Sequence, residues 1–433
     1  MRKSILLSRV VLLLTLLLTL SASLPRAAAV YPQSESETRF GPHGTTWGMP
    51  GRAERPLMSD IGYVNNTLCL SNNALFDGNA SCPGARLFPW VIGWDPVSGL
   101  LYVVTESYVS NLYVINPATN HVAATVPNPI QNGTYGMTFD NRTGNIYLTY
   151  LMANRVLALN ETTYKVAATI PVEGRPYGAV FDGLNGNVYV TDSKSNNVTV
   201  IDAISSSVIK VMPVGGIPSG LALDNQSGRI YVPNFWAGSN NVSVIDGATN
   251  RVVASVPVGN GPLTTVYDYN NNKVYVVNAL NDTVRVINTT TNEVIANISV
   301  GGAPGFPAYD SGNDCLYVPN TANDNVSVID TRTNKLAGSI SVGGSPETVA
   351  YDARNGELYV TNYGDGSVSI IVTSPAKNNP TSTSPPLLWW TLVGVVVIIL
   401  FVATAVVFLV SRRKRIRHEQ ASRQLTSRPA EYS

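Results

Sequence analysis

A tyrosine flanked by aliphatic residues recurs seven times in this chain at almost constant spacing. The intervals between successive tyrosines are 45, 42, 42, 44, 42 and 42 residues. A period of this size, built from short apolar runs, matches one four-stranded propeller blade. One such unit cannot bury both faces alone, so the array must close on itself or be capped. The seven positions are Tyr102, Tyr147, Tyr189, Tyr231, Tyr275, Tyr317 and Tyr359.

Each repeat is expected to hold four strands, A to D, separated by turn signals. In the fourth repeat these strands fall at 221–224, 230–234, 242–246 and 252–258. Four repeats carry proline at one equivalent position of strand D. Proline cannot donate to the ladder and is tolerated at sheet edges, so D is expected on the outside of the blade. These prolines are Pro127, Pro171, Pro213 and Pro257.

The sequence therefore predicts an all-β fold, a seven-bladed β-propeller of four-stranded antiparallel blades at 88–372. Only six D strands can be counted, so the last blade needs a strand from upstream. We expect the N-terminal segment 30–87 to supply it, and 67–76 is the strand-like stretch found there. Cys69 and Cys82 have twelve residues between them, and a disulfide is expected in an exported chain with so few cysteines. Two free thiols are the alternative.

The two ends of the chain predict export and membrane anchoring. Basic residues, an apolar run and small residues follow one another in 1–29, as in a signal peptide, with an uncleaved anchor as the alternative. The uncharged run 387–410 is long enough to cross a bilayer, and the Arg/Lys cluster after it favours a cytoplasmic tail at 411–433. A Pro/Ser/Thr-rich spacer at 373–386 joins the propeller to this span. We thus expect a single-pass cell-surface protein with an extracellular propeller.

Formal charge separates the body of the chain from its tail. Residues 30–386 carry 18 basic and 26 acidic side chains, a net charge of −8, whereas 411–433 carries 7 and 2. Nucleic-acid affinity is supplied largely by Lys and Arg that neutralise phosphates. No nucleic-acid partner is therefore expected for the acidic body.

Several B strands share a motif with a known repeat family. Tyr189-Val190-Thr191-Asp192, Tyr275-Val276-Val277-Asn278 and Tyr359-Val360-Thr361-Asn362 are each followed, nine residues after the tyrosine, by a Val-x-Val-Ile-Asp-like strand. Over about 88–372 the chain resembles the YVTN-type β-propeller repeat of archaeal and bacterial surface-layer proteins. The resemblance implies this architecture and a cell-surface setting, and it carries no catalytic motif. WD-repeat propellers are a poorer match because the Trp-Asp strand end is missing.

The residue types predict neither a catalytic centre nor a cofactor. The outer segment has only His43 and His121, and it lacks metal-ligand spacing, a nucleophile elbow and a phosphate-binding loop. A propeller lyase or lactonase, with carboxylates around a divalent cation at the channel mouth, is the enzymatic alternative. Seven aspartates end the A strands, and we interpret them as turn residues rather than as a metal ring. They are Asp95, Asp140, Asp182, Asp224, Asp268, Asp310 and Asp352.

Loops that follow strand B carry the candidate ligand-binding residues. Function in such folds resides in loops on a rigid scaffold, and the B-to-C loops of the first and fourth repeats are longer than the others. Aromatic rings there suit stacking on a sugar or docking a protein, although packing against a neighbouring loop would also explain them. The candidates are Glu106, Tyr108, Tyr150, Phe235, Trp236 and Tyr363.

Asn-x-Ser/Thr sequons are frequent outside the expected membrane span, as in surface loops of exported proteins. Three of them share one repeat position, where asparagine is also favoured by the backbone. The glycosylation candidates are Asn65, Asn79, Asn132, Asn141, Asn160, Asn197, Asn225, Asn241, Asn281, Asn288, Asn297 and Asn325.

Together these features predict a non-catalytic binding or adhesion module of the cell envelope. Its expected partner is an envelope protein or polysaccharide, in addition to the membrane. A structural surface-layer component and the enzyme named above are the alternatives.

Overall fold

Strands make up most of the chain that the computed structural model describes, which comprises residues 62–70, 74–77, 82, 87–106, 110–130, 133–236 and 238–373. The expected signal peptide, membrane span and basic tail, and all but the first residue of the spacer, lie outside these residues. Within the described part of the chain, no helix is both long and apolar enough to span a membrane.

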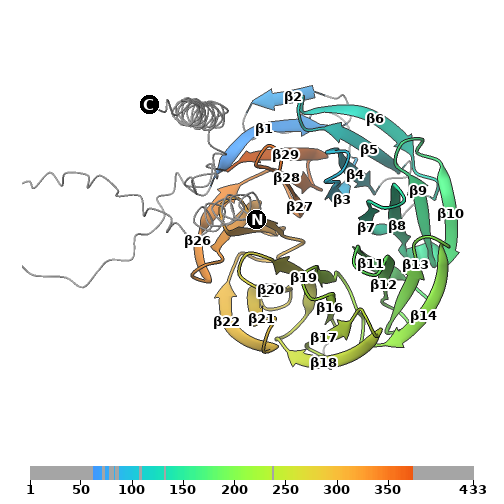
Figure 1. Ribbon diagram of the computed structural model, residues 1–433. Coiled ribbons are helices and arrows are strands. Elements are labelled where there is room, and N and C mark those ends of the chain that lie inside the picture. Colours follow the sequence, from blue (N-terminus) through green and yellow to red (C-terminus); the bar gives the residue numbers. More distant parts are fainter. Residues whose placement is uncertain are drawn as a thin grey trace, which may run out of the picture. The chain divides into compact units, whose positions relative to one another are not determined.

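Seven antiparallel sheets are arranged around a common centre (Figure 1). In blades 1 to 6 the four repeat strands are neighbours in chain order, with the first strand nearest the centre and the last at the rim, and the three repeat strands of blade 7 follow the same order. The predicted all-β seven-bladed propeller, with four-stranded blades and strand D outside, is therefore confirmed. The prolines that end strands D lie at this rim, where no further strand needs their missing donor.

The strand bounds repeat from blade to blade. Blade 1 comprises β3 (Pro89–Trp94), β4 (Leu101–Thr105), β5 (Asn111–Asn116) and β6 (His121–Pro127), and blade 2 comprises β7 (Thr134–Asp140), β8 (Asn145–Tyr150), β9 (Arg155–Asn160) and β10 (Val166–Pro171). Blade 3 comprises β11 (Pro176–Asp182), β12 (Asn187–Asp192), β13 (Asn197–Asp202) and β14 (Ser207–Pro213), and blade 4 comprises β15 (Ala222–Asp224), β16 (Arg229–Asn234), β17 (Asn241–Asp246) and β18 (Arg251–Pro257). Blade 5 comprises β19 (Pro262–Asp268), β20 (Lys273–Asn278), β21 (Thr283–Asn288) and β22 (Glu293–Ser299), and blade 6 comprises β23 (Ala308–Asp310), β24 (Cys315–Asn320), β25 (Asn325–Asp330) and β26 (Lys335–Ser341). Blade 7 comprises β27 (Pro346–Asp352), β28 (Glu357–Asn362) and β29 (Ser367–Val372), and one 3₁₀ turn, η2 (Leu151–Ala153), follows β8.

The seventh blade takes its outer strands from the beginning of the described chain. β1 (Tyr63–Cys69) pairs antiparallel with β29, and β2 (Ala74–Asp77) pairs outside β1 as a fifth strand. The strand that completes this blade therefore starts four residues earlier than the expected 67–76, and the second half of that stretch forms the extra strand. A disulfide joins Cys69 to Cys82, while Cys315 is free and buried.

The repeated tyrosine of each B strand is fully buried between two blades. In five blades the hydroxyl of this tyrosine reaches the turn between strands C and D of the next blade, as it does for Tyr147, Tyr189, Tyr231, Tyr275 and Tyr359. Tyr189 Oη lies 2.6 Å from Asn250 Oδ1, and Tyr275 Oη lies 2.8 Å from Asn334 Oδ1. A buried hydroxyl must find a partner, and here that partner belongs to the neighbouring blade. The tyrosine period thus marks the contacts that hold adjacent blades together.

The aspartates at the ends of the A strands act as turn residues. Asp95 Oδ1 accepts a hydrogen bond from the Val97 N–H at 3.0 Å, and Asp268 Oδ1 accepts one from the Asn270 N–H at 3.1 Å. The same bond to the residue two positions on occurs at the other five aspartates. This is the arrangement by which aspartate stabilises a tight turn.

Candidate ligand site at the channel mouth

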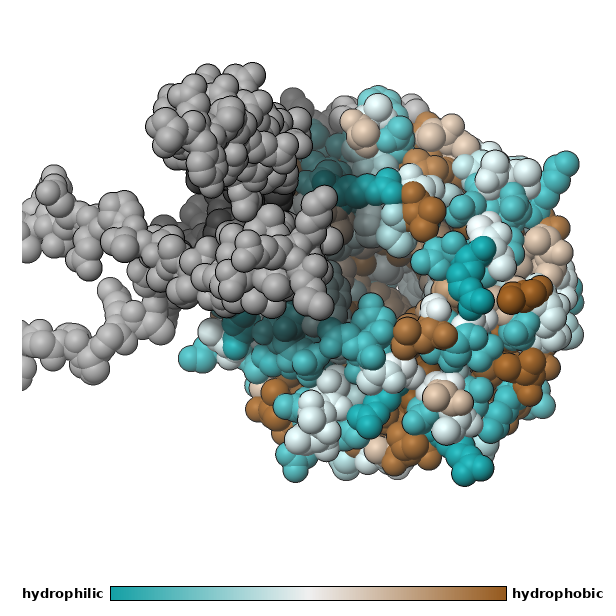
Figure 2. Space-filling model, viewed as in Figure 1, coloured by the Kyte–Doolittle hydropathy of each residue, from teal (hydrophilic) through white to brown (hydrophobic). Residues whose placement is uncertain are grey.

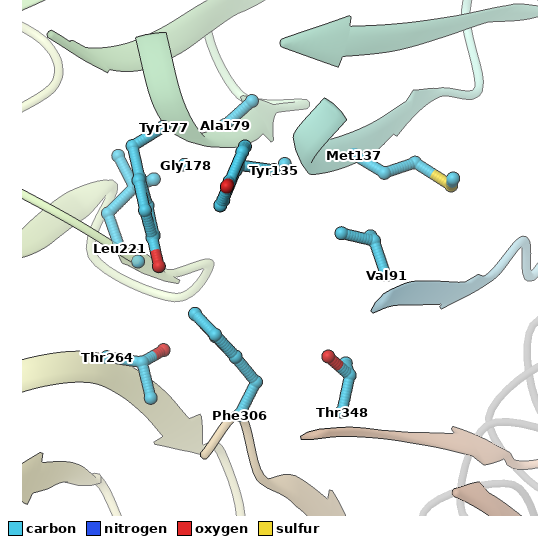
Figure 3. Close-up of a pocket in the computed structure, with 12 residues that line it drawn as sticks. Val91, Tyr135, Met137, Tyr177, Gly178, Ala179, Leu221, Thr264, Phe306 and Thr348 are labelled. Atoms are coloured by element: carbon cyan, nitrogen blue, oxygen red, sulfur yellow. The ribbon is translucent and has the colours of Figure 1, made fainter. Parts of the chain in front are cut away.

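The A-strand segments of all seven blades line one cavity at the centre of the propeller. Its volume is about 140 Å³. Figure 2 shows the central opening between the blades. In Figure 3 the side chains that project into the space include two tyrosines and a phenylalanine. The residues that line it include Tyr135, Tyr177, Thr264, Phe306 and Thr348.

Glycines make this cavity asymmetric. The position four residues before the terminal aspartate of strand A is glycine in blades 2, 3 and 4. A Cβ placed on Gly136 would lie 2.3 Å from the Tyr177 carbonyl oxygen, and one placed on Gly178 would lie 2.8 Å from the Ser219 carbonyl oxygen. The backbones of adjacent blades can approach this closely because Gly136 and Gly178 carry no side chain. The other blades place larger side chains, such as Phe306, at the same position.

The D-to-A and B-to-C loops lie at one end of the propeller, here called the upper face. A series of aromatic rings in mutual contact lies around the channel at this end. The ring centroids of Trp90 and Tyr135 are 5.5 Å apart, and those of Tyr135 and Tyr177 are 5.3 Å apart. Tyr363 lies 5.7 Å from Trp90. The rings meet edge-on or tilted, as aromatic pairs prefer. This series of rings, called the aromatic arc, consists of Phe88, Tyr363, Trp90, Tyr135, Tyr177 and Phe306.

The backbone holds the arc in place. The Glu106 N–H donates to the Phe88 carbonyl at 2.8 Å, which ties the B-to-C loop of blade 1 to the start of β3. Thr348 Oγ1 donates to the Trp90 carbonyl at 2.7 Å, across the junction of blades 7 and 1. The rings therefore stand on strand ends and on short hydrogen-bonded loops, which limits their movement.

Two carboxylates, Glu106 and Glu347, act on the phenols of the arc. The pKa of Tyr135 is raised to about 12 by burial, by the charge of Glu106 and by a hydrogen bond to it. Burial and both glutamates also raise the pKa of Tyr363. Burial, and then the charge of Glu106, raise the pKa of Glu347 to about 7. The phenols thus stay protonated at neutral pH, while Glu347 is poised between its two forms. Glu106, Glu347 and the aromatic arc together are called the channel mouth.

The structure brings two of the predicted ligand residues together and separates others. Glu106 and Tyr363 both belong to the channel mouth. The prediction that Tyr150 contacts a ligand is wrong. Tyr150 is fully buried and its hydroxyl donates to Asn128 Oδ1, so its ring is not presented to solvent. Tyr108 lies outside the described residues.

The aromatic pair of the fourth blade forms a separate feature. Trp236 is 60% exposed on the B-to-C loop, next to the half-buried Phe235. The ring contacts found among the described residues join neither of them to the arc. Trp236 therefore marks a second exposed position on the upper face, away from the channel mouth.

Sequence reasoning did not find Trp90, Tyr135, Tyr177, Phe306 and Glu347. Four of them occupy the position five residues before the terminal aspartate of strand A. A signal was present, because this position is aromatic in the first three repeats and serine, leucine, glycine or glutamate in the others.

The sequons that lie in the described chain are exposed or half-buried. Asn160 and Asn288 also stabilise turns, since the Oδ1 of each accepts hydrogen bonds from the backbone N–H groups two and three positions on. Asn79 and Asn132 lie outside the described residues.

A cluster of three or more potential metal ligands is absent from the described part of the chain. The arrangement at the channel mouth can stack on flat or aliphatic groups, accept hydrogen bonds and attract positive charge.

Comparison with known proteins identifies the fold. No protein-family model matches the sequence, and a search of curated proteins finds no match. Among solved structures, a chain of hydrazine synthase from Kuenenia stuttgartiensis superposes with a TM-score of 0.61 at 18% sequence identity. The match covers 68% of this chain and 98% of that chain. At this level of identity the likeness shows that the two chains share the propeller fold.

Proposed function

We propose that the protein is a non-catalytic binding module of the cell envelope that takes its ligand at the channel mouth. The observation that carries the proposal is the aromatic arc, in which Trp90, Tyr135, Tyr177 and Tyr363 make a continuous series of ring contacts beside two carboxylates. Rigid aromatic surface near the centre of a face is typical of binding sites for sugars and protein partners. An envelope polysaccharide or an envelope protein is the proposed partner.

The setting of this module is also part of the proposal. The YVTN-like B strands, the signal-peptide pattern at 1–29 and the apolar run 387–410 together support a surface protein of the YVTN propeller type, anchored by one span. Protease treatment of intact cells should then remove the propeller and leave the basic tail. Protection of the propeller would contradict this topology.

A binding screen with the full-length protein in detergent tests the site. Glycans and envelope proteins are screened against the natural chain, against a Tyr135→Ala, Tyr363→Ala double variant, and against Trp236→Ala as the matched aromatic control. The double variant should lose at least about tenfold in affinity, since removing central aromatic rings costs about 1–4 kcal/mol in typical interfaces. Trp236→Ala should bind normally. The reverse pattern would place the site on the fourth blade.

The structural surface-layer alternative has its own outcome in the same experiment. A lattice component should assemble into ordered sheets when purified, and it should bind none of the screened ligands in a way that depends on Tyr135.

A further inference from the structure

We infer that the channel mouth binds an organic ammonium group. The inference rests on the proposed function and names the chemistry of its ligand. Three observations support it: two carboxylates that form no salt bridge within the described residues, rings directed into the cavity, and a volume suited to a small head group.

The two carboxylates lack a counter-ion within the described chain. The salt bridge found there joins Arg332 to Asp330 and involves neither Glu106 nor Glu347. The backbone holds Glu347 at the cavity, because it precedes the lining residue Thr348 and its carbonyl accepts the Phe306 N–H at 2.8 Å. The Glu106 N–H donates to the Phe88 carbonyl at 2.8 Å, at the start of β3. Each glutamate also contributes to the raised pKa values of Tyr177 and Tyr363. Two like charges held near one another in a half-buried site favour an incoming cation.

The walls suit an organic cation. The rings of Tyr135 and Tyr177 and the side chain of Phe306 point into the cavity (Figure 3). Aromatic faces attract ammonium groups through their quadrupole, and several rings around one volume form the arrangement that recognises alkylated ammonium ions. The phenols are neutral at neutral pH, and burial and Glu106 raise the pKa of Tyr135 further, to about 12.

A metal ion fits this site poorly. Calcium takes six to eight oxygen ligands and magnesium demands octahedral oxygen geometry. The channel mouth offers two carboxylates and otherwise mainly ring carbons, and a cluster of three ligand residues is absent from the described chain. A neutral sugar would use the rings but would leave both charges without a partner.

The available space matches a small head group. The cavity of about 140 Å³ has hydroxyl groups from Thr264 and Thr348 on the side opposite the two tyrosines. A trimethylammonium group, or a primary ammonium at the end of a flexible chain, can place its charge near the glutamates and its carbons against the rings.

Calorimetric titration of the full-length protein with choline tests the inference. The matched control ligand is 3,3-dimethyl-1-butanol, which has the same shape without the charge. Choline should bind at least about tenfold more tightly, the difference expected when charge contributes about 1.4 kcal/mol or more. Glu106→Gln and Glu347→Gln should each weaken choline binding by about tenfold. Glu293→Gln, which removes an exposed carboxylate on β22, should have no effect.

The pH dependence gives an independent check that a misfolded variant could not reproduce. Glu106 is the charged group that raises the pKa of Glu347. Glu347 in turn raises the pKa values of Tyr177 and Tyr363. Because the pKa of Glu347 is about 7, the natural protein should bind choline more tightly at pH 8 than at pH 5.5. Glu347→Gln should reduce this dependence. The melting temperature checks that the Glu347→Gln variant is folded. This temperature should not fall, since the substitution removes a charge that is costly to hold in a half-buried position.

The same protein preparation distinguishes the two chemical sources of an ammonium group. Glucosamine is compared with N-acetylglucosamine, and Nα-acetyllysine amide with its Nε-acetylated form. Tighter binding of either amine than of its acetylated form supports the inference and identifies the source.

Failure of the inference is distinguishable from failure of the proposed function. Equal binding of choline and its neutral isostere, no effect of the glutamine variants, or preferential binding of calcium would overturn the ammonium assignment. If a neutral glycan or a protein still binds and is lost with Tyr135→Ala, the proposed function stands. If no ligand responds to Tyr135→Ala, both are wrong.

Discussion

Leu68 of β1 lies directly opposite Val368 of β29, so residues from the two ends of the described chain form one cross-strand pair. Both side chains are fully buried, and they pack with Leu101 and Ile115 of blade 1. The closing strand therefore completes the seventh blade and also contributes to the core between the last blade and the first.

Replacing Leu68 by alanine should destabilise the propeller by about 2–5 kcal/mol, the range for truncating a buried leucine. The urea midpoint of unfolding measures this loss. Tyr63→Ala on the same strand is the control, because Tyr63 is 61% exposed and its removal should change the midpoint little. Equal effects of the two changes would show that β1 contributes no core packing.

Reduction of the disulfide should lower the stability of the seventh blade. Cys69 and Cys82 are separated by 13 positions, and closing a loop of this size is worth about 3 kcal/mol in the chain-entropy model. Thermal unfolding with and without reductant measures the effect. A Cys315→Ser variant should show the same sensitivity to reductant, because Cys315 is not bonded. Insensitivity to reductant in both proteins would contradict the prediction.

Asp192→Asn should stabilise the protein at pH 8. Burial raises the pKa of Asp192 to about 7, and the Thr199 hydroxyl donates to its carboxylate at 2.5 Å. The folded pKa lies above the unfolded one, so the unfolded chain releases its proton first as pH rises and stability falls between about pH 4 and 7. Asparagine removes that loss, and the expected gain is about 1–3 kcal/mol at pH 8.

The gain should shrink at pH 4, which denaturant titrations at the two pH values can measure. Equivalent positions in four other blades carry asparagine, including Asn278. Asn278→Asp is therefore the reverse test and should destabilise the protein at pH 8. A pH-independent effect of either change would show that charge burial is not the cause.

Gly178→Ala should disturb the channel. A methyl group there would meet the Ser219 carbonyl oxygen and Leu221 Cδ2 at 2.8 Å, so the inner strands of blades 3 and 4 must move apart. Overpacking of this kind costs about 1–3 kcal/mol. Gly183→Ala is the control, because its nearest described neighbour lies 3.9 Å away. The melting temperature should fall in the first variant only, and equal values would show that the contact can relax.

The seven repeats could be predicted from the sequence because each blade carries the same pattern of strand and turn residues. The tyrosines are spaced at one blade length, the aspartates end strands A, and the prolines mark the rim. These features depend on local turns and on burial between identical neighbours, which a single repeat already encodes.

The closing strand was misplaced for a physical reason. β1 is polar in its first half, where Tyr63 and Asn65 are exposed, and it contains a register irregularity between Val64 and Asn66. A strand near the rim buries less of its surface than an inner strand, so its apolar pattern is weaker. The stretch 67–76 is more apolar than the first half of β1, so the sequence pattern placed the closing strand too late in the chain.

The channel mouth could be predicted only in part. Glu106 was found because its loop carries an insertion, and Tyr363 because it is an aromatic residue that follows strand B on the same face. Trp90, Tyr135 and Tyr177 were missed because aromatic residues in a strand are ordinary core residues in most proteins. The structure shows instead that Tyr135 and Tyr177 line the central cavity and that the ring of Trp90 contacts the ring of Tyr135.

The position of β29 has a mechanical consequence. Its six residues are hydrogen-bonded to β28 on one side and to β1 on the other, and Val372 lies opposite Tyr63, where β1 begins. A pull along the chain beyond Val372 therefore loads two ladders at once, in shear, rather than peeling a strand from an open edge. The disulfide at Cys69 anchors the far end of β1 under such a load. A propeller closed in this way can bear tension applied beyond Val372 without first losing β29 from the sheet.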